Sequence, residues 1–109
     1  MDISIVIVNW NTRDDLRVAL ESCFRHSGGQ EIEVIVVDNG SADGSPAMVR
    51  EDFPQVQLIA NEENRGYTAA CNQGMERAQG RYYLMLNSDA ELTEGCLDEL
   101  VRMLDENTD

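Results

Sequence analysis

Asn87, Ser88 and Asp89 interrupt an apolar run and are the first candidates for chemistry in this sequence. The run before them, residues 82–86, is typical of a strand buried on both faces. A carboxylate directly after such a strand lies at the rim of the sheet, where open α/β sheets bind ligands. Oxygen ligands there suit a hard cation such as Mg²⁺ or Mn²⁺, which can in turn hold a diphosphate. The alternative is that Asp89 only caps the following turn.

Two further polar clusters follow earlier apolar runs: Asn9-Trp10-Asn11 after residues 3–8, and Asp38-Asn39-Gly40-Ser41 after residues 32–37. The indole of Trp10 could stack on a nucleobase. Asp38 or Asn39 could form a hydrogen bond with the edge of that base. Each cluster also has a simpler interpretation, in which Trp10 is a rim aromatic and the second cluster is an ordinary turn.

The apolar pattern predicts four strands that alternate with four helices. The expected strands are residues 3–8, 32–37, 56–60 and a fourth from Arg81, and the expected helices follow Thr12, cover residues 46–51, carry Tyr67 to Ala78 and carry Leu97 to Leu104. Such alternation predicts an α/β fold, Rossmann-like, with three α/β/α layers around a parallel four-stranded sheet. With the strand order 3-2-1-4, Trp10 and Asp89 face each other across a crevice. Asp38 and Asn39 flank that crevice.

Local signals predict where the helices begin. Thr12 and Asp15 match a capping box. Ser45 and Pro46 suit the N-cap and the first helical position of the second helix. The apolar stripe of the third helix is expected to be core: Tyr67, Cys71 and Met75.

The composition excludes several classes of function. The 109 residues suffice for one domain, and the net charge of −13, from 21 acids and 8 bases, argues against nucleic-acid binding. All bases are Arg, which excludes a P-loop lysine or a Schiff base. The cysteines lack metal-binding spacing and suit buried positions in a reducing compartment: Cys23, Cys71 and Cys96. Without a signal peptide or an apolar span in these residues, we expect a cytoplasmic location.

Five motifs occur in order along the chain: Ser4-Ile-Val-Ile-Val-Asn-Trp-Asn11, Val36-Val-Asp-Asn-Gly-Ser-Ala-Asp-Gly44, Asn61-Glu-Glu-Asn-Arg-Gly-Tyr67, Asn72-Gln-Gly74 and Leu86-Asn-Ser-Asp-Ala90. Together they resemble the family-2 glycosyltransferases, in the rhamnosyltransferase-like branch that builds cell-surface polysaccharides. The resemblance implies the N-terminal, nucleotide-binding half of a GT-A domain. It also implies transfer of a sugar, with inversion, from a nucleotide diphosphate donor to a hydroxyl of a glycan or lipid-linked acceptor. For such an acceptor, the inner face of the membrane is the expected place.

The resemblance also implies roles for the residues of the first two clusters. Val8 and Trp10 match positions that line the base pocket. Asp38 and Asn39 match an Asp-Asp pair whose second acid forms a hydrogen bond with uracil in many members. The amide of Asn39 in place of that acid leaves the identity of the base open, because an amide donates hydrogen bonds as well as accepting them.

The third cluster falls on the family's Asp-x-Asp-type metal motif. Ser88 belongs to the nucleotide site, and Asp89 matches the acid that binds Mg²⁺ or Mn²⁺. Because one carboxylate stands where relatives often have two or three, we expect weak metal binding without a diphosphate. The family's acceptor half and general base lie downstream of Asp109. Residues 1–109 are therefore expected to form a single nucleotide-sugar-binding domain, part of a longer enzyme, that does not turn over alone.

One other interpretation stays open, a non-catalytic nucleotide-binding or docking module built on the same half-fold. The single carboxylate favours it. A phospho-receiver domain, a nucleotidylyltransferase and a dinucleotide binder each need residues after the first strand that Asn9-Trp10-Asn11 does not supply. An isolated half-fold would also leave apolar surface or a strand edge uncovered, so we expect self-association at high concentration.

Overall fold

Four strands and four helices alternate along the chain in the computed structural model, which describes residues 1–107. The strands are β1 (Ile3–Asn9), β2 (Ile32–Asp38), β3 (Gln57–Ala60) and β4 (Tyr82–Asn87). The helices are α1 (Arg13–Arg25), α2 (Ser45–Asp52), α3 (Tyr67–Arg77) and α4 (Cys96–Glu106). The strands pair in parallel in the order β3-β2-β1-β4, which confirms the predicted topology.

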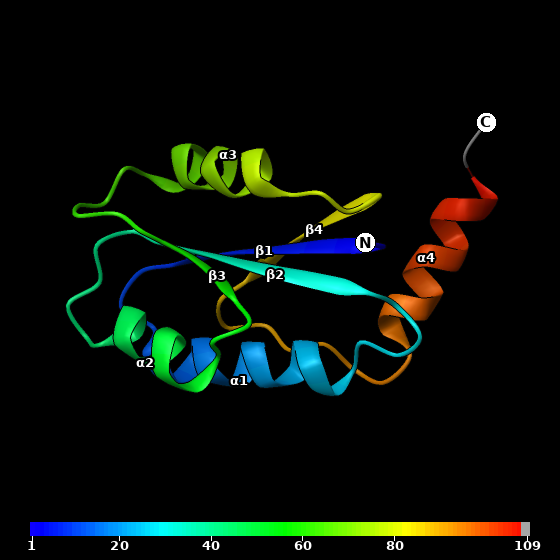
Figure 1. The fold of residues 1–109 in the computed structure, drawn as a ribbon, viewed down its shortest axis with the longest axis horizontal. Helices are drawn as coiled ribbons and strands as arrows, with labels where there is room; N and C mark the ends of the chain where they lie inside the picture. Colours follow the sequence, from blue (N-terminus) through cyan, green and yellow to red (C-terminus); the bar gives the residue numbers. More distant parts are fainter. Residues whose placement is uncertain (108–109) are drawn as a thin grey trace.

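Helices cover both faces of the sheet, with α1 and α2 on one side and α3 on the other (Figure 1). The two central strands are rich in Ile and Val because both of their faces are buried. On the α1 side, Ile5, Leu20 and Val49 belong to the larger core cluster. On the α3 side, Val6 and Ala70 belong to a smaller one. The predicted three-layer arrangement is confirmed.

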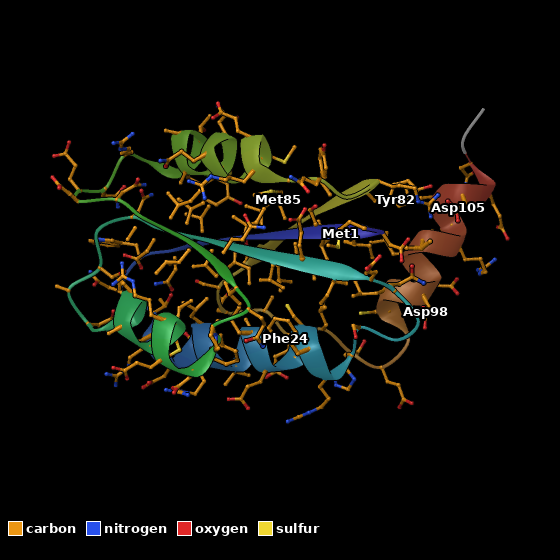
Figure 2. All side chains as sticks on the ribbon, in the orientation of Figure 1. Met1, Phe24, Tyr82, Met85, Asp98 and Asp105 are labelled. Atoms are coloured by element: carbon orange, nitrogen blue, oxygen red, sulfur yellow. The ribbon has the colours of Figure 1, made fainter. Side chains whose placement is uncertain are left out.

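Helix α4 lies beyond the end of the sheet at which β1 starts (Figure 1). Its carboxylate Asp98 accepts hydrogen bonds from Gly29 N, at 3.1 Å, and from Gln30 Nε2, at 2.6 Å. Figure 2 shows Tyr82, the first residue of β4, beside Asp105 of α4, to which its hydroxyl donates. Between residues 1 and 107, no helix is long and apolar enough to cross a membrane.

The predicted capping box is wrong. Thr12 occupies the N-cap position of α1, but its side chain does not cap the helix. Its hydroxyl instead donates to Asn9 Oδ1 at 2.6 Å. The amide of Arg13 donates to Asp43 Oδ2 at 2.8 Å, so an acid from the loop after β2 satisfies the helix end.

Helix α2 begins one residue earlier than predicted. Ser45 is its first residue rather than its N-cap, and Gly44 holds the N-cap position in a left-handed conformation, with φ of 86°. Asp43 Oδ1 accepts hydrogen bonds from the backbone and the hydroxyl of Ser45, at 3.0 and 2.6 Å. Asp43 therefore anchors the starts of both α1 and α2. Strand β3 begins at Gln57 rather than at the predicted Val56, whose amide closes a turn onto Phe53 O.

Strand β4 is not buried on both faces, contrary to the prediction. It is an edge strand whose side chains alternate between half-buried and exposed. The register places Tyr83 and Met85 on the α3 side of the sheet, beside Ser4 and Val6. Helix α3 packs over β1 and β2 instead, which leaves Tyr83 50% and Met85 37% exposed. The apolar run predicts that both faces of β4 are buried, but the described residues cover only the face opposite α3.

The apolar stripe of α3 is also not core, as Tyr67 and Met75 are 58% and 36% exposed and Cys71 is half-buried. Ala70 and Gly74 face the sheet instead. A Cβ on Gly74 would lie 2.3 Å from Val6 Cγ1, so the helix approaches the sheet through its small residues. Of the three cysteines, all free, only Cys23 is fully buried, contrary to the expectation for Cys71 and Cys96.

Candidate functional site

The three polar clusters meet at one edge of the sheet, where the parallel strands end. Val8 pairs with Val37 of β2 on one side and with Asn87 of β4 on the other. Trp10 lies two residues after Val8, and Asp89 lies two residues after Asn87. Because β1 and β4 are parallel neighbours, both residues follow their strands at the same edge of the sheet. The shared edge agrees with the prediction, and the crevice between these two side chains stays a prediction.

The carboxylate of Asp38 is directed into the protein, where it is 1% exposed. Its Oδ1 accepts hydrogen bonds from Asn9 Nδ2 at 2.9 Å and from Ser41 Oγ at 2.8 Å. Its Oδ2 accepts from Ser41 N at 2.9 Å. Asn9 is itself fully buried. Asp38 thus joins the end of β1 to the loop after β2, and its buried charge is held by neutral donors.

The side chain of Asn39 is also buried, with 2% of its surface exposed. Its Nδ2 donates to Gly66 O at 3.2 Å. Its Oδ1 accepts from Asn61 Nδ2 at 3.1 Å and from Arg65 N at 3.3 Å. Asn61 also exchanges two hydrogen bonds with Gln73 of α3, at 2.8 and 2.9 Å. A chain of amides therefore fixes residues 61–66 beside the edge.

The same loop lies directly against Gly40. This glycine has φ of 81°, and a Cβ built on it would lie 2.9 Å from Glu63 Cα. Any other residue would be strained in this conformation and would also push the loop away. A hollow of about 630 Å³ borders the loop on the side of Ala60, Glu62 and Arg65.

The remaining predicted residues are accessible at the junction of β1 and β4. Trp10 is 54% exposed, so a face of its indole can receive a planar ligand. Val8 is half-buried against the core cluster on the α3 side. Ser88 is half-buried and Asp89 is exposed. A turn closed by Ala90 N and Asn87 O, 3.0 Å apart, carries both of them.

Thr12 connects this turn to the end of β1. Its Oγ1 lies 2.6 Å from Asn9 Oδ1 and 3.0 Å from Ser88 Oγ. Through Asn9 the contacts continue to Asp38. The ends of three strands are therefore joined by side-chain hydrogen bonds.

The donor set at this edge fits a partly hydrated cation rather than a closed metal cage. Residues 1–107 contain no group of three or more His, Cys, Asp or Glu side chains that could hold an ion. Asn87 and Asp89 are exposed at this rim and carry hard oxygen atoms, and Ser88 stands between them in the sequence. Mg²⁺ and Mn²⁺ suit such a rim, because they keep several waters and take further ligands from substrate phosphates.

Val8, Trp10, Ser88 and Asp89 lie at the sheet edge that the sequence predicts for them, but the connections between the clusters do not follow from the sequence. Asn9, Thr12 and Ser41 carry these connections, and no role follows from their sequence alone. The polar atoms of Asp38 and Asn39 are engaged inside the protein. Contact of these two with a base therefore stays a prediction. The one available signal is that Asn9 is a polar residue at the last position of a strand whose preceding residues, from Ile5 to Val8, are all apolar.

Comparisons with known proteins agree with this architecture. A family model described as glycosyl transferase family 2 matches residues 4–109. The succinoglycan biosynthesis protein ExoO of Rhizobium meliloti is 38% identical over 105 residues, which are 95% of this chain and 29% of ExoO.

Two solved structures share the fold. S. aureus TarS 1–349 in complex with UDP-GlcNAc superposes with a TM-score of 0.84 at 24% identity, over 97% of this chain and 32% of TarS 1–349. The mannosyltransferase PcManGT from Pyrobaculum calidifontis, in complex with GDP-Man and Mn²⁺, superposes with a TM-score of 0.80 at 25% identity, over 98% and 32% of the two chains. The chain spans about three tenths of the length of these proteins. On the family match over residues 4–109, the chain belongs to glycosyl transferase family 2.

Proposed function

We propose that this chain is the donor-binding half of a glycosyltransferase that moves a sugar from a nucleotide diphosphate to a hydroxyl of a glycan or lipid-linked acceptor. The observation that carries the proposal is that an exposed indole, Trp10, and an exposed carboxylate, Asp89, follow adjacent parallel strands at the same edge of the sheet. Ligands of open α/β sheets bind at such an edge. Membership of glycosyl transferase family 2 supports the same reaction class.

In this proposal the base stacks on Trp10, and Val8 forms an apolar side of its pocket. Asp38 and Asn39 contribute by fixing the two loops that border the base. The buried hydrogen bonds of both residues support this division of roles. The identity of the base then depends on the groups that the 61–66 loop presents, a loop that the amide of Asn39 holds in place.

The diphosphate lies at the end of β4 in this proposal. Asp89 binds Mg²⁺ or Mn²⁺ together with the donor phosphates, and Ser88 borders the same ion. Once bound there, the metal would neutralise the charge that develops on the leaving diphosphate. The complex of PcManGT with GDP-Man and Mn²⁺ supports a divalent ion for this fold.

The full reaction is proposed for a longer protein. A general base must take the proton of the acceptor hydroxyl, and we place it outside residues 1–109. Transfer with inversion, of a rhamnosyl or another hexosyl group, is the reaction we propose. ExoO is named for succinoglycan biosynthesis, which supports a polysaccharide acceptor. The three free thiols suit a cytoplasmic location, at the inner membrane face for a lipid-linked acceptor.

A thermal-shift series with UDP, dTDP and GDP, each with and without Mn²⁺, tests the donor site. A ligand that binds only the folded state raises the melting temperature. We expect one nucleotide to raise it further when Mn²⁺ is present, and Asp89→Ala to remove only that additional rise. Asp14→Ala, an exposed acid on α1, is the control for the change in charge. An equal Mn²⁺ effect in Asp89→Ala would refute the metal assignment.

The single carboxylate favours a second candidate, a nucleotide-binding module without catalysis. Both candidates predict donor binding, but they differ in turnover by a longer protein that contains this domain. Sugar transfer by that protein, lost in Asp89→Ala, is expected for the enzyme. Retained nucleotide binding without any transfer would favour the module.

A further inference from the structure

We propose that Thr12 is a positioning residue that orients the hydroxyl of Ser88, so that Ser88 presents oxygen lone pairs rather than its proton beside Asp89. The proposal rests on the function proposed above, because it assigns a cation to this turn. Thr12 touches neither the base pocket nor the metal in this account. It acts through Ser88.

The positions of the hydrogen atoms follow from counting donors and acceptors. Asp38 is the acceptor for Asn9 Nδ2, which fixes the amide of Asn9 with its Oδ1 toward Thr12. An amide oxygen only accepts hydrogen bonds, so Thr12 must donate its single proton to it. The contact of 3.0 Å between Thr12 Oγ1 and Ser88 Oγ then requires Ser88 to be the donor.

The result is a directional chain of hydrogen bonds from Ser88 to Thr12 and Asn9, ending at the carboxylate of Asp38. The hydroxyl of Ser88 has one proton, which it donates to Thr12. Only the lone pairs of its oxygen then remain available to other partners. A hydroxyl in this state can bind a cation or accept a hydrogen bond from a metal-bound water. It cannot donate to a phosphate oxygen without breaking the contact with Thr12.

Thr12 is available for this role because Asp43, rather than Thr12, accepts the hydrogen bond from the start of α1. The amide of Arg13, at the start of α1, is satisfied by Asp43, and the Thr12 side chain makes no bond to the helix. The hydroxyl faces the strand ends instead. Asn9, which accepts the hydrogen bond from Thr12, is fully buried, so its amide cannot turn toward water.

The test combines Thr12→Val, which keeps the shape and removes the hydroxyl, with Thr12→Ser, which keeps the hydroxyl. Ser4→Ala is the matched control, because Ser4 is a buried hydroxyl with two hydrogen bonds at the opposite end of β1. The affinity of the purified chain for UDP, dTDP and GDP is measured by calorimetry over a series of Mn²⁺ concentrations and in EDTA.

We expect Thr12→Val to raise the half-saturating Mn²⁺ concentration by about tenfold, the usual loss when an outer partner of a metal ligand is removed. The affinity of Thr12→Val for the nucleotide in EDTA should stay within about twofold of the wild-type value, since Thr12 does not contact the base pocket. Thr12→Ser should restore the wild-type Mn²⁺ dependence, and Ser4→Ala should lower the melting temperature without altering that dependence. An unchanged Mn²⁺ dependence in Thr12→Val, or an equal loss in EDTA, would overturn the proposal.

A measurement without ligand separates this inference from the proposed function. Amide hydrogen exchange across residues 88–91 should quicken in Thr12→Val and not in Ser4→Ala, because Thr12 contacts that turn through Ser88 and Ser4 does not. Unaltered exchange there would contradict the positioning role whether or not a nucleotide binds. If the wild-type chain bound none of the nucleotides, the proposed function would fail, and the exchange result would still decide whether Thr12 orders the turn.

Discussion

Single residues at the edge of this sheet act mainly through partners that are distant in sequence. Asn39 holds Gly66, 27 positions away, and Thr12 contacts Ser88, 76 positions away. At the other end of the sheet, Glu33 shows the same principle. It accepts hydrogen bonds from Ser4 Oγ and from Gln79 N, across the sheet from its own strand.

The hydrogen bonds of Glu33 predict a specific dependence of stability on pH. Burial raises the pKa of Glu33, but hydrogen bonds from Ser4, Gln79 and Gln57 outweigh it and hold the pKa below its usual value. A lowered pKa in the folded state stabilises the protein above the unfolded pKa, roughly 4.3, and this contribution is lost as the pH falls through the folded pKa. Glu33→Gln should therefore lower the unfolding free energy at pH 7 and reduce its decline toward pH 3.

Urea denaturation at pH 7, 5 and 3 measures this difference. Glu21→Gln, an exposed acid on α1, makes the same change in charge and serves as the control. Parallel stability curves for wild type and Glu33→Gln over this pH range would contradict the account of Glu33.

At the scale of elements, the residue pattern predicts the strands well because the Ile and Val runs of β1 and β2 need two covered faces. It predicts β4 and α3 less well. The apolar residues Tyr83, Met85 and Met75 fit a core position by type, but what covers a strand depends on the packing of other elements. Likewise, the pattern of Thr12 and Asp15 is a correct signal for a helix start, yet Asp43 satisfies that helix end instead.

The packing of α3 on the sheet gives a prediction about Gly74. A Cβ there would lie 2.3 Å from Val6 Cγ1 and 3.4 Å from Val37 Cγ2. Alanine favours a helix by about 1 kcal/mol over glycine, but overpacking costs about 1–3 kcal/mol. We expect Gly74→Ala to lower the unfolding free energy by up to about 2 kcal/mol in chemical denaturation.

A double-mutant cycle provides the control. In a Val6→Ala background the nearest obstructing methyl is absent, so the same glycine substitution should cost less. An equal cost in both backgrounds would show that contact with Val6 does not limit the approach of α3.

At the scale of the whole molecule, the uncovered side of β4 is the main departure from a closed domain. Tyr83, Met85 and Met75 are exposed on the side of the sheet where α3 lies, and Figure 2 shows Met85 there. β4 also presents an unpaired edge to solvent within the described part of the chain. Apolar surface beside a free strand edge favours pairing with a second chain.

We expect the chain to dimerise at high concentration through this side of β4. The net charge of −13 opposes association, so added salt should strengthen it. Replacing both Tyr83 and Met85 by Thr should shift the dimer toward monomer in sedimentation velocity, whereas Met103→Thr, a change at an exposed methionine of α4, should not. A monomer at every concentration and salt level, or a dimer unaffected by the double variant, would contradict this.

If Trp10 and Asp89 belong to one nucleotide site, a nucleotide bound there must change the fluorescence of Trp10, which is the only tryptophan in the sequence. The fluorescence is titrated with the nucleoside diphosphate that raises the melting temperature, with and without Mg²⁺, in wild type and in Asp89→Ala. We expect the nucleotide to quench the indole and Mg²⁺ to lower the half-saturating nucleotide concentration in wild type. In Asp89→Ala the quenching should persist without the Mg²⁺ effect. Unchanged fluorescence at a nucleotide concentration that calorimetry shows to be saturating, or the same Mg²⁺ effect in both proteins, would contradict the shared site.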